Sequence, residues 1–279
     1  MASFGDLSRI GGNIQALQAL NSLNVINKEL GIRQLRLATG KRINSAEDDA
    51  AGFVISRTLQ ARGRGLSTAL NNVGDAKSML SVAEGGLESI LDILETMKEK
   101  VTQAASDTLG TSERNAIEDE LDALTAEIDD IVTETTFNGN SLLTDVDKTI
   151  QTGAETTDTL VVAVTTQNHT AGALTVADAN ITVSSSSYAS AALGNINTAI
   201  TTVKNSIASV GASQARLATK ESTLSTAITN TEASRSRIAD ADFAKEQLEA
   251  LKSQIMQQTA TAALAQANAA PQVVLSLFG

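Results

Sequence analysis

The stretch LSTALNNVGDAKSMLSVAEGGLESILDILETMKEKV, residues 66–101, decides the fold class of this chain. Its large apolar side chains recur at steps of three, four and seven residues, at Leu66, Leu70, Val73, Leu80, Leu87, Ile90, Leu94, Met97 and Val101. This heptad spacing predicts a long helix whose apolar seam packs against other helices. Polar Lys77 and Glu84 stand at the two skipped seam positions.

The same seam returns on both sides of this stretch. It recurs at Ile117, Leu121, Leu124, Ile128 and Ile131, and again at Ile196, Ile200, Val203, Ile207, Val210, Leu217, Leu224 and Ile228, with Gln214 and Glu221 at skipped positions. Looser stripes mark both ends of the chain, at Ile10, Ile14, Leu17, Leu20, Leu23, Ile26 and Leu30 and at Leu248, Leu251 and Ile255. The one proline is Pro271, so nothing before it forbids long helices. The sequence therefore predicts a mainly α fold, a long antiparallel coiled-coil-like bundle of N- and C-terminal segments.

The pattern changes between Asn138 and about Ser190. The segments TDTLVVAVTTQ (157–167) and ALTVADANITVSSSS (173–187) are rich in Thr and Val with partial alternation. They predict two to four short strands and exposed loops, with the four serines at a loop or strand edge. A small β insert therefore interrupts the helices.

Composition excludes several classes of function. Aromatic residues make up 2% of the chain, too few for an ordinary compact core of this length. The net charge of -11 argues against nucleic acid, whose phosphates require a basic surface. There is no cysteine, so disulfides, thiolate chemistry and the common zinc sites are excluded. No apolar run reaches the length of a membrane span, and residues 1–20 do not resemble a cleaved secretory signal, so we expect no membrane insertion.

Catalysis finds no candidate constellation in the sequence. His169 is the only histidine, and its polar surroundings predict an ordinary surface residue. The acids at 47–49 and at Asp240 and Asp242 lack the ligand spacing of a calcium loop, and we interpret them as favourable charges at helix starts. The sequence therefore predicts no enzyme, cofactor or metal site, and an interaction protein is the leading hypothesis.

The chain ends in APQVVLSLFG, with large apolar residues at Val273, Val274, Leu275, Leu277 and Phe278. Burying these five side chains is worth about 10 kcal/mol in total. Ordering the last nine residues costs roughly 13 kcal/mol, so the tail is not expected to order alone. We predict that it orders against a partner.

Four stretches resemble bacterial flagellin. They are LATGKRINSAEDDAAGFVISRTLQAR (37–62), ETTFNGNSLL (134–143), SRIADADFAKEQ (236–247) and ALAQANAAPQVVLSLFG (263–279). The resemblance covers residues 1 to about 143 and about 190 to 279, in order, with the insert where flagellins vary. Two departures are RLATGKRINSA in place of the commoner RLSSGLRINSA, and the ending Phe278-Gly279 in place of a leucine and an arginine.

The resemblance implies an extracellular flagellar filament subunit for motility, exported through the type III apparatus without a cleaved signal. It implies a terminal helical domain (1–40 and 240–279) lining the filament core, a second helical domain (41–143 and 190–239) and a surface insert (144–189). Implied partners are other copies of the chain, an export chaperone at the C-terminal segment, and the hook-associated and filament-cap proteins. The residues expected to support self-assembly are Ile10, Ile14, Leu17, Leu20, Arg42, Ile43, Asn44, Leu264, Val273, Val274, Leu275, Leu277 and Phe278.

Two further surfaces follow from the resemblance. In flagellins that activate an animal Toll-like receptor, the related helix has a sequence like QRMRELAVQ. This chain has ETMKEKVTQ at 95–103, so Thr96 and Lys100 replace an arginine and a leucine next to Glu95, and we expect a poor response. The insert is expected on the outer filament surface, with O-glycan acceptors at Ser184, Ser185, Ser186 and Ser187.

Three alternatives remain open at this stage. The first is the hook–filament junction protein of the same family, which we expect to match the KRINSAEDDAAG and DADFAKE stretches less well. The second is a secreted enzyme with catalysis placed in the insert, and the third is a soluble helical adaptor. An adaptor would keep its oligomeric state after loss of the last nine residues.

Overall fold

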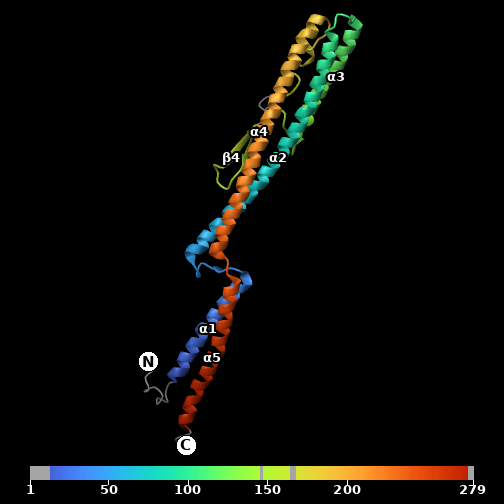
Figure 1. Ribbon diagram of the computed structural model, residues 1–279. Coiled ribbons are helices and arrows are strands. Elements are labelled where there is room, and N and C mark those ends of the chain that lie inside the picture. Colours follow the sequence, from blue (N-terminus) through green and yellow to red (C-terminus); the bar gives the residue numbers. More distant parts are fainter. Residues whose placement is uncertain (1–12, 145–146, 164–167, 276–279) are drawn as a thin grey trace. The chain divides into compact units, whose positions relative to one another are not determined.

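The computed structural model describes residues 13–144, 147–163 and 168–275. Long helices account for most of this part of the chain: α1 (Ile14–Thr39), α2 (Ala50–Ala104), α3 (Thr111–Glu134), α4 (Ser186–Ala239) and α5 (Phe243–Leu275) (Figure 1). The mainly α prediction is therefore confirmed, and the strands are confined to short antiparallel pairs.

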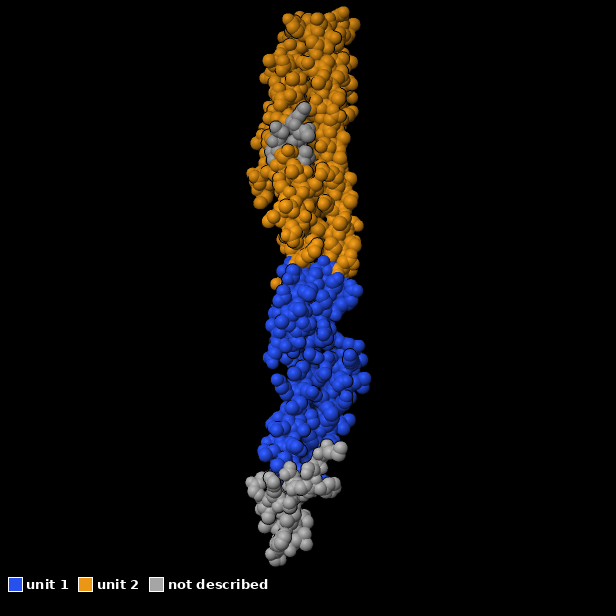
Figure 2. All heavy atoms as spheres, turned by 90° about the vertical axis from the view of Figure 1, so that its left-hand side faces the viewer, with its two compact units in different colours: residues 1–61, 231–279 blue, residues 62–230 orange. Residues whose placement is uncertain are grey.

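The chain divides into two compact units, coloured separately in Figure 2. Unit 1 comprises residues 1–61 and 231–279, and unit 2 comprises residues 62–230. The helices α2 and α4 each contribute residues to both units. The division into three domains expected from the sequence stays a prediction.

Unit 2 has one continuous apolar core shared by α2, α3 and α4. Most residues of the heptad seams lie in it, and Leu80, Leu87, Leu94 and Met97 are fully buried. The polar residues at skipped seam positions pair across α2 and α4: Lys77 Nζ lies 2.7 Å from Glu221 Oε2, and Gln214 Nε2 donates to Glu84 Oε2 at 2.7 Å. These pairs match an antiparallel alignment of the two helices.

Two small hairpins follow α3. Strands β1 (Thr136–Phe137) and β2 (Asn140–Ser141) are joined by Asn138 and Gly139, which both have positive φ, of 49° and 77°. An Asn-Gly pair of this kind is the favoured two-residue hairpin turn. Strands β3 (Asp147–Gln151) and β4 (Thr159–Ala163) pair antiparallel, with Asp147 opposite Ala163.

No strand forms in residues 173–183, which belong to the stretch 173–187 where the sequence predicts strands and loops. This segment forms turns and a short 3-10 helix, η2 (Asp178–Asn180). Its alternating apolar residues are nevertheless buried in the unit 2 core, at Leu174, Val176, Ile181 and Val183. The backbone N–H of Val176 bonds to Ala171 O within a turn, and Thr175 takes a φ of 60°, so the segment buries alternate side chains without a pairing strand.

Of two more expectations about the insert, one is wrong and one is right only in part. His169 is fully buried rather than exposed, and its Nε2 lies 2.9 Å from Ser206 Oγ on α4. Of the four serines expected at a loop or strand edge, Ser184 and Ser185 lie in a loop, whereas Ser186 and Ser187 form the start of α4. Ser185 Oγ accepts a hydrogen bond from Tyr188 N. Serine oxygens commonly cap the first turn of a helix in this way.

Candidate functional site

The helices α1 and α5 of unit 1 lie side by side (Figure 1). Much of their apolar surface is exposed. Among the described residues of unit 1, the buried apolar side chains are Leu30, Ile43, Ala239 and Ala250. Large apolar residues that remain exposed on these two helices are Ile14, Leu17, Leu20, Val25, Leu35, Phe243, Leu248, Leu251 and Ile255. We call these nine residues the open apolar face. Leu17 is 59% exposed and Leu248 is 68% exposed, although leucine is among the residues most often buried in folded proteins.

Polar contacts tie α1 to α5 along their length. At one end, Arg33 Nη1 lies 2.9 Å from Glu246 Oε2, and Arg36 Nη1 lies 3.4 Å from the other carboxylate oxygen. Glu246 is buried, and these two guanidinium groups compensate its charge. Further along, Gln257 Nε2 donates to Asn27 Oδ1 at 2.7 Å. The order of these contacts shows that the helices run antiparallel.

The far end of the pair carries a groove of about 490 Å³. Its lining is mainly apolar, with Leu17 and Leu20 on α1 and Leu264 on α5. Asn13 closes one side, where its Nδ2 donates to the backbone oxygen of Ala267 at 2.6 Å. The groove thus brings together three of the residues expected to support self-assembly.

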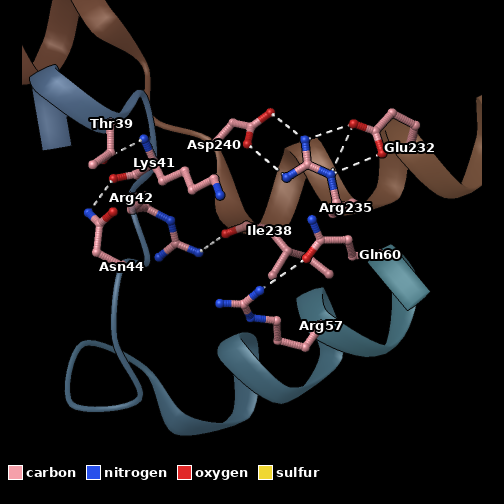
Figure 3. A network of polar contacts seen from close by, with 10 residues as sticks. All are labelled: Thr39, Lys41, Arg42, Asn44, Arg57, Gln60, Glu232, Arg235, Ile238 and Asp240. Atoms are coloured by element: carbon pink, nitrogen blue, oxygen red, sulfur yellow. Dashed lines mark hydrogen bonds and ion pairs between the residues drawn. The ribbon is translucent and has the colours of Figure 1, made fainter. Parts of the chain in front are cut away.

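The segment 40–49 joins α1 to α2 and is fixed to the end of α4 (Figure 3). Gly40 ends α1 with a φ of 67°, a conformation that glycine adopts without steric cost. The backbone N–H of Arg42 donates to Ala239 O at 2.7 Å, and the N–H of Ala241 donates to Gly40 O at 2.9 Å. The guanidinium of Arg42 adds a bond from Nη2 to Ile238 O at 2.7 Å, so its position is set by the main chain of α4.

Acidic side chains shape the second half of this junction segment. Asp48 Oδ2 accepts hydrogen bonds from the backbone N–H groups of Ser45 and Asn44, both at 3.0 Å, and these bonds lower the pKa of Asp48. Asp49 Oδ1 accepts from Gly52 N at 2.9 Å and caps the start of α2. The interpretation of these acids as helix-start groups agrees with this geometry. Among the described residues, no three or more His, Cys, Asp or Glu side chains are placed so that they could hold a metal ion.

An ion-pair cluster holds the end of α4. Arg235 contacts Glu232 at 2.8 Å and Asp240 at 3.3 Å, and its hydrogen bond to Glu232 lowers the pKa of that carboxyl group. Figure 3 shows Arg235 between its two acidic partners. Arg57 on α2 bonds to Gln60 and lies 5.1 Å from the centroid of the Phe53 ring. These contacts give the junction a defined shape with exposed cationic groups.

The structure separates the predicted assembly residues by environment. Ile14, Leu17, Leu20 and Arg42 are exposed, whereas Ile43 is only 5% exposed and packs inside unit 1. Asn44 is half-buried, and its Nδ2 donates to Lys41 O. Val273, Val274 and Leu275 lie in α5, but side chains there are described only as far as residue 269. Ile10, Leu277 and Phe278 lie outside the described residues.

The two other predicted surfaces lie in unit 2. Thr96 is exposed on α2, and Lys100 is 2.6 Å from Glu120 Oε1. Glu95 lies 3.6 Å from Lys204. Of the serine run, Ser184 and Ser187 are exposed, while Ser185 and Ser186 are half-buried at the start of α4.

Sequence reasoning missed the polar ties between α1 and α5. Asn13 stands directly before an apolar stripe, which is the usual sequence signal of a helix cap. Nothing in that signal indicates its hydrogen bond to Ala267, 254 residues away. Glu246 lies in the DADFAKEQ motif, but only Asp240 and Asp242 of that motif were interpreted from the sequence, as favourable charges at a helix start. Within the described ranges, no helix is both long and apolar enough to span a membrane.

Comparison with known proteins defines the class of protein that carries this arrangement. Residues 10–148 match the bacterial flagellin N-terminal helical region, and residues 193–278 match the bacterial flagellin C-terminal helical region. A flagellin of Halalkalibacterium halodurans is 35% identical over 272 residues, covering 96% of this chain and 99% of the relative. A flagellin of Bacillus subtilis is 36% identical over 304 residues, covering 97% and 99%.

The chain therefore belongs to the bacterial flagellin family, and it is a structural subunit of the bacterial flagellar filament. A protein described as a flagellar hook-associated protein from Vibrio parahaemolyticus superposes with a TM-score of 0.56 at 17% identity, covering 69% of this chain and 100% of that one. At this identity the likeness concerns the fold alone, and it does not favour the hook–filament junction alternative.

Proposed function

We propose that the open apolar face of α1 and α5 is the surface on which copies of this chain polymerise. The observation that supports the proposal is the exposure of leucines on helices that bury little within their own unit, such as Leu17 and Leu248. Fully burying one such side chain is worth about 1.5–3 kcal/mol. Several of them on each copy supply a strong drive for association in water.

The proposed contacts form three groups. The groove residues Leu17, Leu20 and Leu264 contact a neighbouring copy directly, as do Ile10, Ile14 and the tail residues Val273, Val274, Leu275, Leu277 and Phe278. Arg42 and Asn44 contact a neighbour from the junction segment. Ile43 holds that segment in shape from inside unit 1, because it is buried there.

Export and the remaining partners follow from family membership. We propose that the chain leaves the cell through the flagellar type III apparatus without a cleaved signal. A chaperone covers the apolar C-terminal segment before assembly, and hook-associated and cap proteins contact the chain at the ends of the filament. Its role is structural and not enzymatic.

Polymerisation tests this function directly. The purified chain, given a salting-out agent, should form long filaments visible by electron microscopy, whereas a discrete oligomer would contradict the proposal. Leu17→Asp and Leu20→Asp should each prevent polymerisation by placing a charge in a buried contact. Tyr188→Asp is the matched control, because Tyr188 is 60% exposed on α4 of unit 2.

The receptor and glycan expectations remain proposals for unit 2. Lys100 presents a charge that is already paired with Glu120, so an apolar receptor surface would have to desolvate or break this pair. We expect soluble subunit to stimulate reporter cells poorly, and Thr96→Arg combined with Lys100→Leu to raise the response. Exposed Ser184 and Ser187 are the better glycan acceptors of the serine run, and the intact mass of native filaments would reveal a modification.

A further inference from the structure

A proline lies inside the last helix of unit 1. Pro271 is within α5, and proline has no backbone N–H to donate. In an α-helix, the N–H of residue 271 would bond to the carbonyl oxygen of Ala267, four residues earlier. Pro271 therefore leaves the Ala267 carbonyl without its usual helical donor.

Asn13, near the other end of the chain, donates a hydrogen bond to this carbonyl oxygen. Its Nδ2 donates to Ala267 O at 2.6 Å, while its Oδ1 accepts from Ala16 N at 3.0 Å and caps α1. Its own backbone oxygen accepts from Leu17 N at 3.1 Å. One short side chain thus completes the first turn of α1 and fills the gap in the hydrogen bonding of α5.

This contact limits sliding of α1 along α5 more than the other ties do. The buried apolar side chains between the two helices are few among the described residues, so the apolar seam specifies register weakly. Arg33, Arg36 and Gln257 have long side chains that can follow a small shift. Asn13 is short and bonds to a main-chain atom, and a slip of one residue moves a helix by about 1.5 Å.

We propose that Asn13 and Pro271 form a register clip, with Asn13 as the positioning residue and Pro271 as the residue that frees its acceptor. The clip sets the alignment in which Leu17 and Leu20 on α1 lie beside Leu264 on α5 in one groove. It rests on the proposed function, because this groove is the surface offered to a neighbouring copy. The clip makes polymerisation depend on one register of the helix pair.

A double-mutant cycle tests the clip by the critical concentration for polymerisation in a pelleting assay. Asn13→Asp keeps the cap on Ala16 but replaces the Nδ2 donor with an oxygen facing a carbonyl. We expect it to raise the critical concentration about tenfold, the effect of one lost hydrogen bond with its acceptor left unmet. Asn71→Asp is the matched control, because it makes the same change from amide to carboxylate at an exposed position of α2 in unit 2, outside the groove, and it should change the value less than about twofold.

The second arm of the cycle uses Pro271→Ala. This change restores an N–H that can bond to Ala267 O, so Asn13→Asp in this background should cost less than about threefold. Equal effects of Asn13→Asp in the two backgrounds would overturn the clip. If Asn13→Asp blocks polymerisation completely, rescue by Pro271→Ala supports the clip and failure of rescue overturns it.

A distance measurement separates register from general stability. The sequence contains no cysteine, so spin labels can be placed at Ser22→Cys on α1 and Ala262→Cys on α5, with labelled chains diluted into unlabelled polymer. Parent and Asn71→Asp polymers should give one narrow distance, Asn13→Asp a shifted or broadened one, and the variant that combines Asn13→Asp with Pro271→Ala a narrow one again. An unchanged narrow distance in Asn13→Asp overturns the clip. The proposed function would fail separately, if Leu17→Asp polymerised normally.

Discussion

The two units use helices of similar composition in opposite ways. In unit 2, apolar residues of α2, α3 and α4 such as Leu94 and Leu121 are removed from solvent completely within one chain. In unit 1, Leu30 is the one buried residue of α1, and exposed leucines such as Leu17 face outward. Unit 2 therefore has an apolar core of its own, whereas α1 and α5 of unit 1 leave large apolar side chains exposed.

Removing the C-terminal tail should have the largest effect of all the changes considered. This effect should fall on polymerisation and not on the folding of unit 2. We expect deletion of residues 271–279 to raise the critical concentration for polymerisation by at least a hundredfold, because we propose that neighbouring copies bury the apolar side chains of this tail. Urea unfolding of the soluble chain should retain the transition of unit 2. Normal filaments from the shortened chain would contradict the comparison.

A cavity in the core of unit 2 should instead lower the stability of the monomer. Leu94→Ala removes a fully buried side chain and should lower the free energy of unfolding by about 2–5 kcal/mol, measured by urea denaturation of the monomer. Leu17→Ala, at a 59% exposed position, should change the same quantity by less than about 0.5 kcal/mol. A comparable loss from both substitutions would show that the units do not differ as proposed.

The buried hydrogen bond between His169 and Ser206 allows a further test of the core of unit 2. Ser206→Ala removes the hydroxyl partner of His169 Nε2 at a site where both residues are buried. We expect a loss of about 1–3 kcal/mol in the free energy of unfolding of the monomer. Ser222→Ala, an exposed change on the same helix, serves as the control and should be close to neutral.

The smallest expected effect is a pH dependence confined to the junction of unit 1. Folding lowers the pKa of Asp48 below its ordinary value of 3.8, through bonds from Ser45 N–H and Asn44 N–H. The charged carboxylate therefore stabilises the junction above about pH 4, and this contribution is lost as the pH falls through the lowered pKa. Pepsin cleavage within residues 40–49 should accelerate toward pH 2, and less steeply in Asp48→Asn than in the parent. The same pH profile for both chains would exclude Asp48 as the cause.

The sequence predicts the helices well because their signal is local. A heptad seam shows from neighbouring residues which face of α2 is buried, and Leu80 and Leu87 are buried as that seam requires. The seam also identified Lys77, Glu84, Gln214 and Glu221 as exceptions, but it did not predict that they pair across α2 and α4, because the partners lie far apart in the chain.

The predictions from the sequence fail where contacts between residues far apart in the chain override the local sequence pattern. His169 looks like a polar loop residue, yet Ser206 on α4 supplies a partner that makes its burial acceptable. Residues 173–183 alternate like a strand, but turn hydrogen bonds satisfy part of their backbone. The contact from Asn13 to Ala267 joins residues near opposite ends of the chain, and only folding brings them together.

The burial of His169 gives this protein a built-in spectroscopic reporter. The chain contains one histidine, so its imidazole ring protons give resonances that no other residue type overlaps in a selectively labelled sample. Because His169 belongs to the insert and its buried ring contacts Ser206 on α4, its chemical shift reports on the integrity of unit 2. Nuclear magnetic resonance on histidine-labelled filaments could therefore follow the insert in a particle far too large for conventional spectra, without adding any tag.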